Sequence, residues 1–424
     1  MLPLALILAT LPQSLTLDEA LELSHTHQPT LRQAQAQTEA AKARTTQALA
    51  PLLPTVTMGL GYQRATANFA AQAGAVPSGV DVVANASLDS YDYWTGNVRA
   101  SATLWDFGQG WHRYQASLST ADAQQANERA ARRTSDASVR TLFYAAASQK
   151  ELVQVAQVAL DNTAAHLAQI DGMVKVGTRP EIDLAQAKAD VANARLTLVN
   201  AKKAYAVARA RVAQAIGVEV APTFDVVSAS AAEVGGEASA VDALMDQALG
   251  ARPEVAALAA QVKAQELTVR STRGAYFPTL GVSLGGTLAS RSLPTIVPNL
   301  SGQVTLNWAL YEGGATLGKE REGEATLRQL EAQRDGLRQQ VRLELEQALL
   351  DVSAAKEGVE VAGEANAAAQ EKLRLAEGRY KAGAGSALEL SDAQVAATQA
   401  AAQEVQARFT LSSARASLIA ALGG

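Results

Sequence analysis

The chain contains no cysteine. Disulfide bonds, thiolate metal sites, cysteine nucleophiles and a lipid-modified N-terminal cysteine are therefore excluded. Aromatic residues make up only 4% of the 424 residues, and alanine supplies much of the 48% apolar share. Alanine has the highest helix propensity but buries little surface, so this composition favours long helices with narrow seams over a large compact core.

Strong charge and long apolar runs are also missing. The net charge is −5 at pH 7 and no basic block is present, so nucleic acid is not an expected partner. After residue 12, no apolar stretch approaches the roughly 18 residues that a membrane-spanning helix needs. Neither a phosphate-binding loop nor a nucleophile–base pair is recognisable, so we expect no enzymatic activity and no cofactor.

The first 14 residues form a segment of their own. MLPLALILATLPQS is a short apolar run followed by small and polar residues, as in a secretory signal peptide, although the basic start of such peptides is missing. We predict a signal peptide over residues 1–14. A buried N-terminal segment and a mis-assigned start codon are the alternatives.

The remainder of the chain is an internal duplication. The matching positions are Pro29 with Pro253 and Pro54 with Pro278 at an offset of 224, then LWDFG (104–108) with LYEGG (310–314) at an offset of 206. The offset falls by 18, which places 18 extra, turn-rich residues in the first copy between residues 62 and 104. We predict a first repeat over 15–217, a linker over 218–240 and a second repeat over 241–424.

Each copy contains two short stretches with the alternation of a β-strand. After Pro278, Leu280, Val282 and Leu284 share one face, whereas the intervening residues are glycine and serine. A period of two residues is typical of a strand with unlike faces. The predicted strands are about 54–64, 94–105, 278–288 and 300–311.

Long helices follow the strands. Residues at every seventh position form two apolar series, namely Val139, Ala146, Val153, Leu160, Leu167 and Val174, and Leu345, Val352, Val359, Asn366, Leu373 and Tyr380. Such a sustained heptad predicts a coiled-coil seam. A helix over about 109–175 would be about 100 Å long. Helices at about 30–50 and 181–216 would run antiparallel to it, so that the two copies build four helical rods.

The strands have the length and alternation of membrane β-strands, about ten residues each. Only a closed barrel satisfies its backbone in lipid, and four strands are too few to close one. We therefore expect several chains to share a barrel around a pore. Aromatic residues near the strand ends suit a membrane interface, and they are Tyr62, Trp94, Trp105, Tyr276, Phe277 and Trp308. A soluble β-sandwich with one solvent-exposed face is the alternative.

The order and duplication of these segments resemble the TolC family of outer-membrane efflux proteins. The resemblance covers about residues 15–424 and rests on LTLDEALELSHTHQPTL, APLLPTV, AYFPTLGVS, LWDFGQG, LYEGG and VGTRPEIDLAQA. It implies a mainly α fold with a small β part. Long antiparallel coiled-coil helices would form an α-barrel, and four strands per chain would contribute to a trimeric 12-stranded transmembrane β-barrel.

The resemblance also implies a location and partners. The chain would be a homotrimer in contact with outer-membrane lipid, with a large periplasmic helical extension. It would bind a periplasmic adaptor protein and, through it, an inner-membrane transporter. The implied function is the passive exit duct of a tripartite efflux or type I secretion system. Catalytic residues, cofactors and metal sites are not expected.

Two glycine-containing turns join the long helices to the next ones, and we name them the first tip (176–180) and the second tip (382–386). Thr178 with Glu181 and Ser386 with Glu389 are predicted capping boxes. The residues predicted to contact an adaptor are Gly177, Thr178, Gly383 and Gly385.

Acidic residues just beyond the tips are the candidate periplasmic gate. Glu389 and Asp392 are three residues apart and share a helix face, so the resemblance implies two stacked acidic rings in a trimer that favour cations. Asp183 is the first-copy counterpart of Glu389. The simpler interpretation is that acids are favoured here by the helix dipole alone.

One tip position departs from the family pattern. The gate arginine of the family belongs to the second tip, where this chain has Gly385. Arg179 in the first tip is therefore our candidate for a contact that holds the tips together. A periplasmic adaptor or a structural coiled-coil protein is the competing function. An adaptor should contain a single hairpin and a lipoyl-like β domain, whereas this sequence predicts two hairpins.

Overall fold

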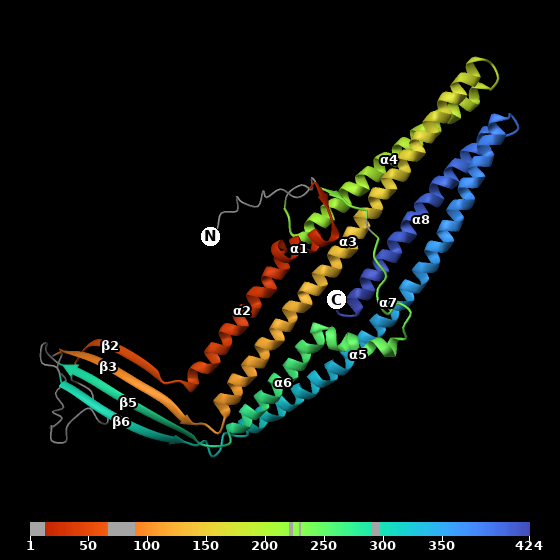
Figure 1. The fold of residues 1–424 in the computed structure, drawn as a ribbon. Coiled ribbons are helices and arrows are strands. Elements are labelled where there is room, and N and C mark those ends of the chain that lie inside the picture. Colours follow the sequence, from red (N-terminus) through yellow and green to blue (C-terminus); the bar gives the residue numbers. More distant parts are fainter. Residues whose placement is uncertain (1–12, 67–89, 220–223, 229, 291–296) are drawn as a thin grey trace, which may run out of the picture. The chain divides into compact units, whose positions relative to one another are not determined.

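The computed structural model describes residues 13–66, 90–219, 224–228, 230–290 and 297–424 (Figure 1). Most of the predicted signal peptide and of the 18-residue insertion lie outside these residues. Contacts divide the chain into a helical unit (Met1–Thr38, Gln124–Leu258 and Gln333–Gly424) and a strand unit (Glu39–Ala123 and Ala259–Ala332). Each unit combines matching parts of both sequence repeats.

Two helical hairpins dominate the helical unit. Helix α3 (Gln109–Lys175) is followed by α4 (Glu181–Ile216), and α7 (Ala315–Lys381) by α8 (Ala387–Ala421). Figure 1 shows each hairpin as an antiparallel pair. The long helices are continuous because good helix formers dominate them and no proline interrupts them. None of the helices within the described ranges is apolar over a long enough window to span a bilayer.

Shorter elements precede each hairpin. Helices α1 (Leu17–His27) and α5 (Val241–Ala251) are the first helices of the two repeats. Helices α2 (Pro29–Leu49) and α6 (Pro253–Gly274) each begin at a proline, whose fixed φ suits the first helical position. The remaining short elements are a 3₁₀ helix (Ala50–Leu52) and strands β1 (Ser14–Leu15) and β4 (Asp225–Val226), which pair in parallel.

The predicted seams form the core of the helical unit. Val139 and Ala146 of α3 are fully buried, as is Leu345 of α7, and Val352 and Leu373 are also buried. The heptad prediction is therefore confirmed at these positions. Near the middle of each seam the burial is incomplete, since Val153, Leu160, Val359 and Asn366 are only half-buried.

The strand unit contains one antiparallel sheet with the order β2-β3-β5-β6. Its strands are β2 (Thr55–Thr66), β3 (Ser90–Trp105), β5 (Thr279–Ser290) and β6 (Val297–Asn307). Strand β3 begins four residues earlier than predicted, and β6 ends four residues earlier. At the end of β6, the indole N–H of Trp308 donates to the Tyr276 carbonyl, 3.2 Å away.

Candidate functional sites in the sheet and at the helix tips

The sheet has one apolar face and one polar face. Residues that pair directly across strands lie on the same face, and the register places nine exposed apolar side chains together: Val56, Met58, Leu60, Val98, Leu284, Leu288, Leu300, Val304 and Leu306. Leu60 is 79% exposed and Leu300 87%. A soluble monomer rarely leaves so continuous an apolar surface in water, so this face needs lipid or another apolar partner.

Aromatic residues lie at both ends of the apolar face. Tyr62 packs on Trp94 at one end, with ring centroids 4.6 Å apart. Trp105 and Trp308 lie at the other end and are both exposed. The eleven residue-to-residue steps from Trp94 to Trp105 rise about 36 Å along the strand, or about 25 Å at the usual tilt, which matches the apolar band of a membrane barrel.

A β-bulge brings Trp105 to the apolar face. The pairing of β3 with β5 shifts between Thr103 and Trp105, so Trp105 pairs with Leu280. Without the shift, alternation would have placed the indole on the polar face, because a one-residue slip exchanges the faces. The bulge thus completes the aromatic boundary at this end of the sheet.

The two tips share one backbone geometry. Gly177 and Gly383 have φ values of 76° and 74°, which a residue with a Cβ adopts only with strain. The amide of Thr178 donates to the Met173 carbonyl, and that of Ala384 to the Arg379 carbonyl, each at 2.9 Å. Both tips therefore end their long helices in Schellman motifs.

Helices α4 and α8, which follow the two tips, have different N-caps. Ser386 caps α8 by accepting from the Glu389 amide, 3.1 Å away. The predicted capping box of Thr178 and Glu181 is wrong, because Pro180 occupies the N-cap position of α4 and the Thr178 hydroxyl donates to the Met173 carbonyl instead. The Ser386–Glu389 box is only half formed, since the Glu389 carboxylate binds Arg379.

Arg179 links the first tip to the second. Its guanidinium carbon lies 4.4 Å from the ring centroid of Tyr380, and Nη2 donates to the Tyr380 carbonyl at 3.3 Å. Asp183 lies 4.0 Å from the same guanidinium. The His166 ring also packs against the Tyr380 ring in a T-shaped arrangement, with the ring centroids 5.1 Å apart. Two side chains of the first hairpin therefore hold one tyrosine of the second.

The acidic residues of the second tip have unequal environments. Glu389 accepts from Arg379 at 2.6 Å and is about one-third exposed. Asp392 is exposed and forms no ion pair within the described part of the chain. An arginine in place of Gly385 would be crowded, because a Cβ there would lie 3.1 Å from the Tyr380 amide nitrogen. Glycine at this position is thus explained by close backbone approach.

Sequence reasoning missed three residues at the tips. Tyr380 was predicted only as a seam residue, and His166 and Arg379 were not predicted to contribute at all. Burial raises the pKa of the Tyr380 hydroxyl, and burial of the imidazole lowers the pKa of His166. The sequence signal that could have identified Tyr380 is its polar aromatic side chain in the second seam, at the position where the first seam has Val174.

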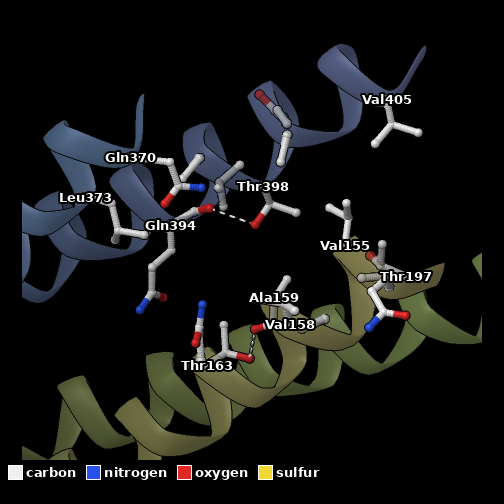
Figure 2. Close-up of a pocket in the computed structure, with 18 of the residues that line it drawn as sticks. Val155, Val158, Ala159, Thr163, Thr197, Gln370, Leu373, Gln394, Thr398 and Val405 are labelled. Carbon is white, nitrogen blue, oxygen red and sulfur yellow. Dashed lines mark hydrogen bonds between the residues drawn. The ribbon is translucent and has the colours of Figure 1, made fainter. Parts of the chain in front are cut away.

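A groove of about 840 Å³ lies between the two hairpins of the helical unit. Figure 2 shows it lined by Val155, Val158 and Leu373 together with the polar Gln370 and Gln394. The hairpins are tied on the tip side of the groove, where Ser391 donates to Asp190 at 3.0 Å. Together with the buried cluster around Ile170, Tyr380 and Leu390, this bond joins the two hairpins on their tip side.

Clusters of three or more metal-binding side chains are absent from the described residues. His25 bonds with Asp136 at 2.6 Å and with Arg132, so its ring is engaged in a local polar network. The sites with functional geometry are thus the two-faced sheet and the linked tips.

A sheet with an aromatic-bounded apolar face, in one chain with long helical hairpins, defines an outer-membrane channel protein. A family model described as outer membrane efflux protein matches residues 20–218 and 244–424. The chain therefore belongs to the outer membrane efflux protein family. It functions as an outer-membrane efflux channel with a large periplasmic helical part, as the TolC-like resemblance predicted.

Individual relatives agree with this assignment. The pyoverdine export outer membrane protein OpmQ of Pseudomonas putida is 29% identical over 423 residues, covering 96% of this chain and 86% of its own. A membrane protein from Pseudomonas aeruginosa has the same fold with a TM-score of 0.83 and 18% identity, covering 96% of this chain and 92% of that chain. VceC of Vibrio cholerae has the same fold with a TM-score of 0.81 and 18% sequence identity, and the match covers 96% of each chain.

Proposed function

We propose that three copies of the chain close one 12-stranded barrel and form the exit duct of a tripartite efflux or type I secretion system. The observation that carries the proposal is the sheet itself. Strands β2 and β6 are its two edges and run antiparallel to each other. An unpaired edge is not tolerated in lipid, so β6 of one copy would pair with β2 of the next.

Exposed seams on the helices support the same assembly. The described part of the chain leaves these seams uncovered, although their spacing resembles that of a packed seam. These seams include the exposed apolar residues Ile182, Leu196, Val199 and Val207 on α4, and Leu343, Leu350, Val361 and Leu375 on α7. We infer that α4 of one copy packs against α7 of the next, which would close the helical part into an α-barrel.

The tips are the proposed contact with a periplasmic adaptor. Gly177, Thr178 and Gly383 are exposed at the ends of the hairpins, and Gly385 is half-buried beside them. Through the adaptor the duct would couple to an inner-membrane transporter, which supplies the energy. The chain itself would be a passive conduit.

Native mass and single-channel recording test this proposal. The detergent-extracted protein should have the mass of three chains plus detergent, and it should form discrete channels in planar bilayers. A detergent-independent soluble monomer would contradict the proposal and would instead favour a structural coiled-coil or adaptor role.

Arg179→Ala should open the periplasmic end of the duct. A cation–π contact contributes about 1 kcal/mol, so three copies acting together would shift the closed–open equilibrium by about a hundredfold. The measurement is the open probability of single channels. Lys175→Ala is the matched control, since Lys175 pairs with Asp171 on its own helix. An open probability equal to that of the wild type would exclude Arg179 as a latch.

The proposed acidic rings predict selectivity for cations at the tip. Asp392→Asn should raise the half-blocking concentration of a trivalent cation applied from the periplasmic side by about tenfold. Glu389→Gln should weaken the block in the same direction, because it leaves the positive charge of Arg379 without its counter-ion. Glu371→Gln, which removes an exposed carboxylate paired with Arg374, is the control. Equal block in all four proteins would remove the acidic-ring assignment.

A further inference from the structure

The polar face of the sheet carries a single ionised side chain. Among the described strand residues on this face, glycine, serine, threonine, asparagine and glutamine predominate, and only Arg99 is charged. Arg99 pairs with Thr57 on β2 and with Gly285 on β5. Its side chain is exposed and has no carboxylate partner among the described residues. The guanidinium is therefore an uncompensated positive charge.

The position of Arg99 between the two aromatic ends of the sheet determines whether its side chain can face lipid or the pore. It lies five residues from Trp94 and six from Trp105 along β3, halfway between the two aromatic ends. An unpaired charge at the membrane midplane is costly on the lipid side and is tolerated where it faces a water-filled cavity. The strand register also places Arg99 on the polar face, because its neighbour Val98 belongs to the apolar face.

Nearby acids do not neutralise Arg99. Asp92 is on the apolar face, where it accepts from the Tyr62 hydroxyl at 2.8 Å and lies 3.8 Å from Arg64. Beyond the other end of the strands, Asp106 accepts from the amides of Gly108 and Gly110. The acid nearest to Arg99 along its own strand thus points to the opposite face.

We propose that Arg99 forms a ring of positive charge inside the strand-lined part of the pore and binds the oxyanion groups of passing solutes, such as carboxylates and phosphates. The inference rests on the proposed trimeric channel. A guanidinium binds such groups in a bidentate fork. Gly285, directly opposite, adds no side chain of its own, and the Ser301 hydroxyl lies 3.1 Å from where its Cβ would be, as a further hydrogen-bond donor.

Block by citrate from the extracellular side tests the ring. Three guanidinium groups on the order of 10 Å from a trivalent anion should strengthen its binding about tenfold at 0.1 M salt. Arg99→Gln should therefore raise the half-blocking citrate concentration about tenfold, whereas Arg99→Lys should keep most of the block. Arg64→Gln is the matched control, because Arg64 is a strand arginine on the other face, paired with Asp92.

Equal citrate block in wild type and Arg99→Gln, or an equal change in Arg64→Gln, would overturn the proposal. If Arg99→Gln does not assemble, Thr57→Glu adds a carboxylate directly opposite and should weaken block in the same direction. A wild-type protein that forms no channels would instead refute the proposed duct. Open channels without the Arg99 effect would refute this inference alone.

Discussion

Leu284→Arg should sharply reduce the amount of assembled protein in the outer membrane. Leu284 is in the central strand β5, pairs with Ala100 and Gly302, and is 62% exposed on the apolar face. Ala100 lies midway between Trp94 and Trp105, so residue 284 is at the proposed midplane. An arginine there costs about 2–4 kcal/mol in a membrane barrel, or about 6–12 kcal/mol in a trimer.

The adjacent residue is the control for this prediction. Ser283→Arg adds the same side chain to the same strand but on the polar face, opposite Ser101 and Gln303. It should assemble nearly as well as the wild type, because a lumen accepts charge. The measurement is the fraction of trimer in outer-membrane extracts by native gel. Equal loss in both variants would show that the two faces of the sheet do not differ in environment.

Glu237→Gln should destabilise the helical unit by about 3 kcal/mol. Glu237, in the predicted linker 218–240, is 5% exposed and accepts from the Arg415 Nε at 2.9 Å. Lys356 lies 2.5 Å from its other oxygen. Removing the carboxylate charge leaves Arg415, which is 11% exposed, buried without its main counter-ion. Breaking a buried pair from one side typically costs about 3–5 kcal/mol.

The urea midpoint of the helical circular dichroism signal in detergent measures this loss. Glu233→Gln is the control, because Glu233 lies 3.6 Å from Arg415 but is 82% exposed. Its midpoint should stay close to that of the wild type. If Glu237→Gln unfolds at the wild-type midpoint, the network does not fix the linker to α7 and α8.

The same network predicts a pH dependence. Burial of Glu237 opposes its ionisation, but hydrogen bonds from Lys356, the Val234 amide and Arg415 outweigh that cost and lower its pKa to about 2. Because the folded pKa is below the unfolded value of about 4.5, the stabilisation is complete above pH 4.5. It is lost as the pH falls from 4.5 towards 2, by about 3 kcal/mol in all. Glu237→Gln should lack this part of the pH profile.

Features set by local periodicity were predictable from the sequence. The heptads of valine, leucine and alanine indicated α3 and α7, and Pro29 and Pro253 marked helix starts. Alternation around Leu284 indicated a strand with unlike faces. These signals are local because the helix and strand repeats depend only on neighbouring residues. The family resemblance added the membrane location, which the family match confirms.

Contacts between distant segments were not predictable in the same way. Arg179 and Tyr380 are 201 residues apart, and only the packing of two hairpins brings them together. Thr178 was wrongly predicted as a cap because Pro180 takes that position. The bulge that turns Trp105 to the apolar face breaks the simple period of two. Each case depends on three-dimensional context that spacing does not contain.

Cysteine scanning along β5 tests most directly whether the two faces of the sheet meet lipid and water. The chain has no cysteine, so each single substitution gives one reactive thiol. In intact outer membranes, Ser283→Cys and Thr287→Cys should react with a hydrophilic maleimide through the lumen, whereas Val282→Cys and Leu284→Cys should react only with a lipid-soluble one. Equal reaction of all four with the hydrophilic reagent would contradict a membrane-spanning barrel with a water-filled pore.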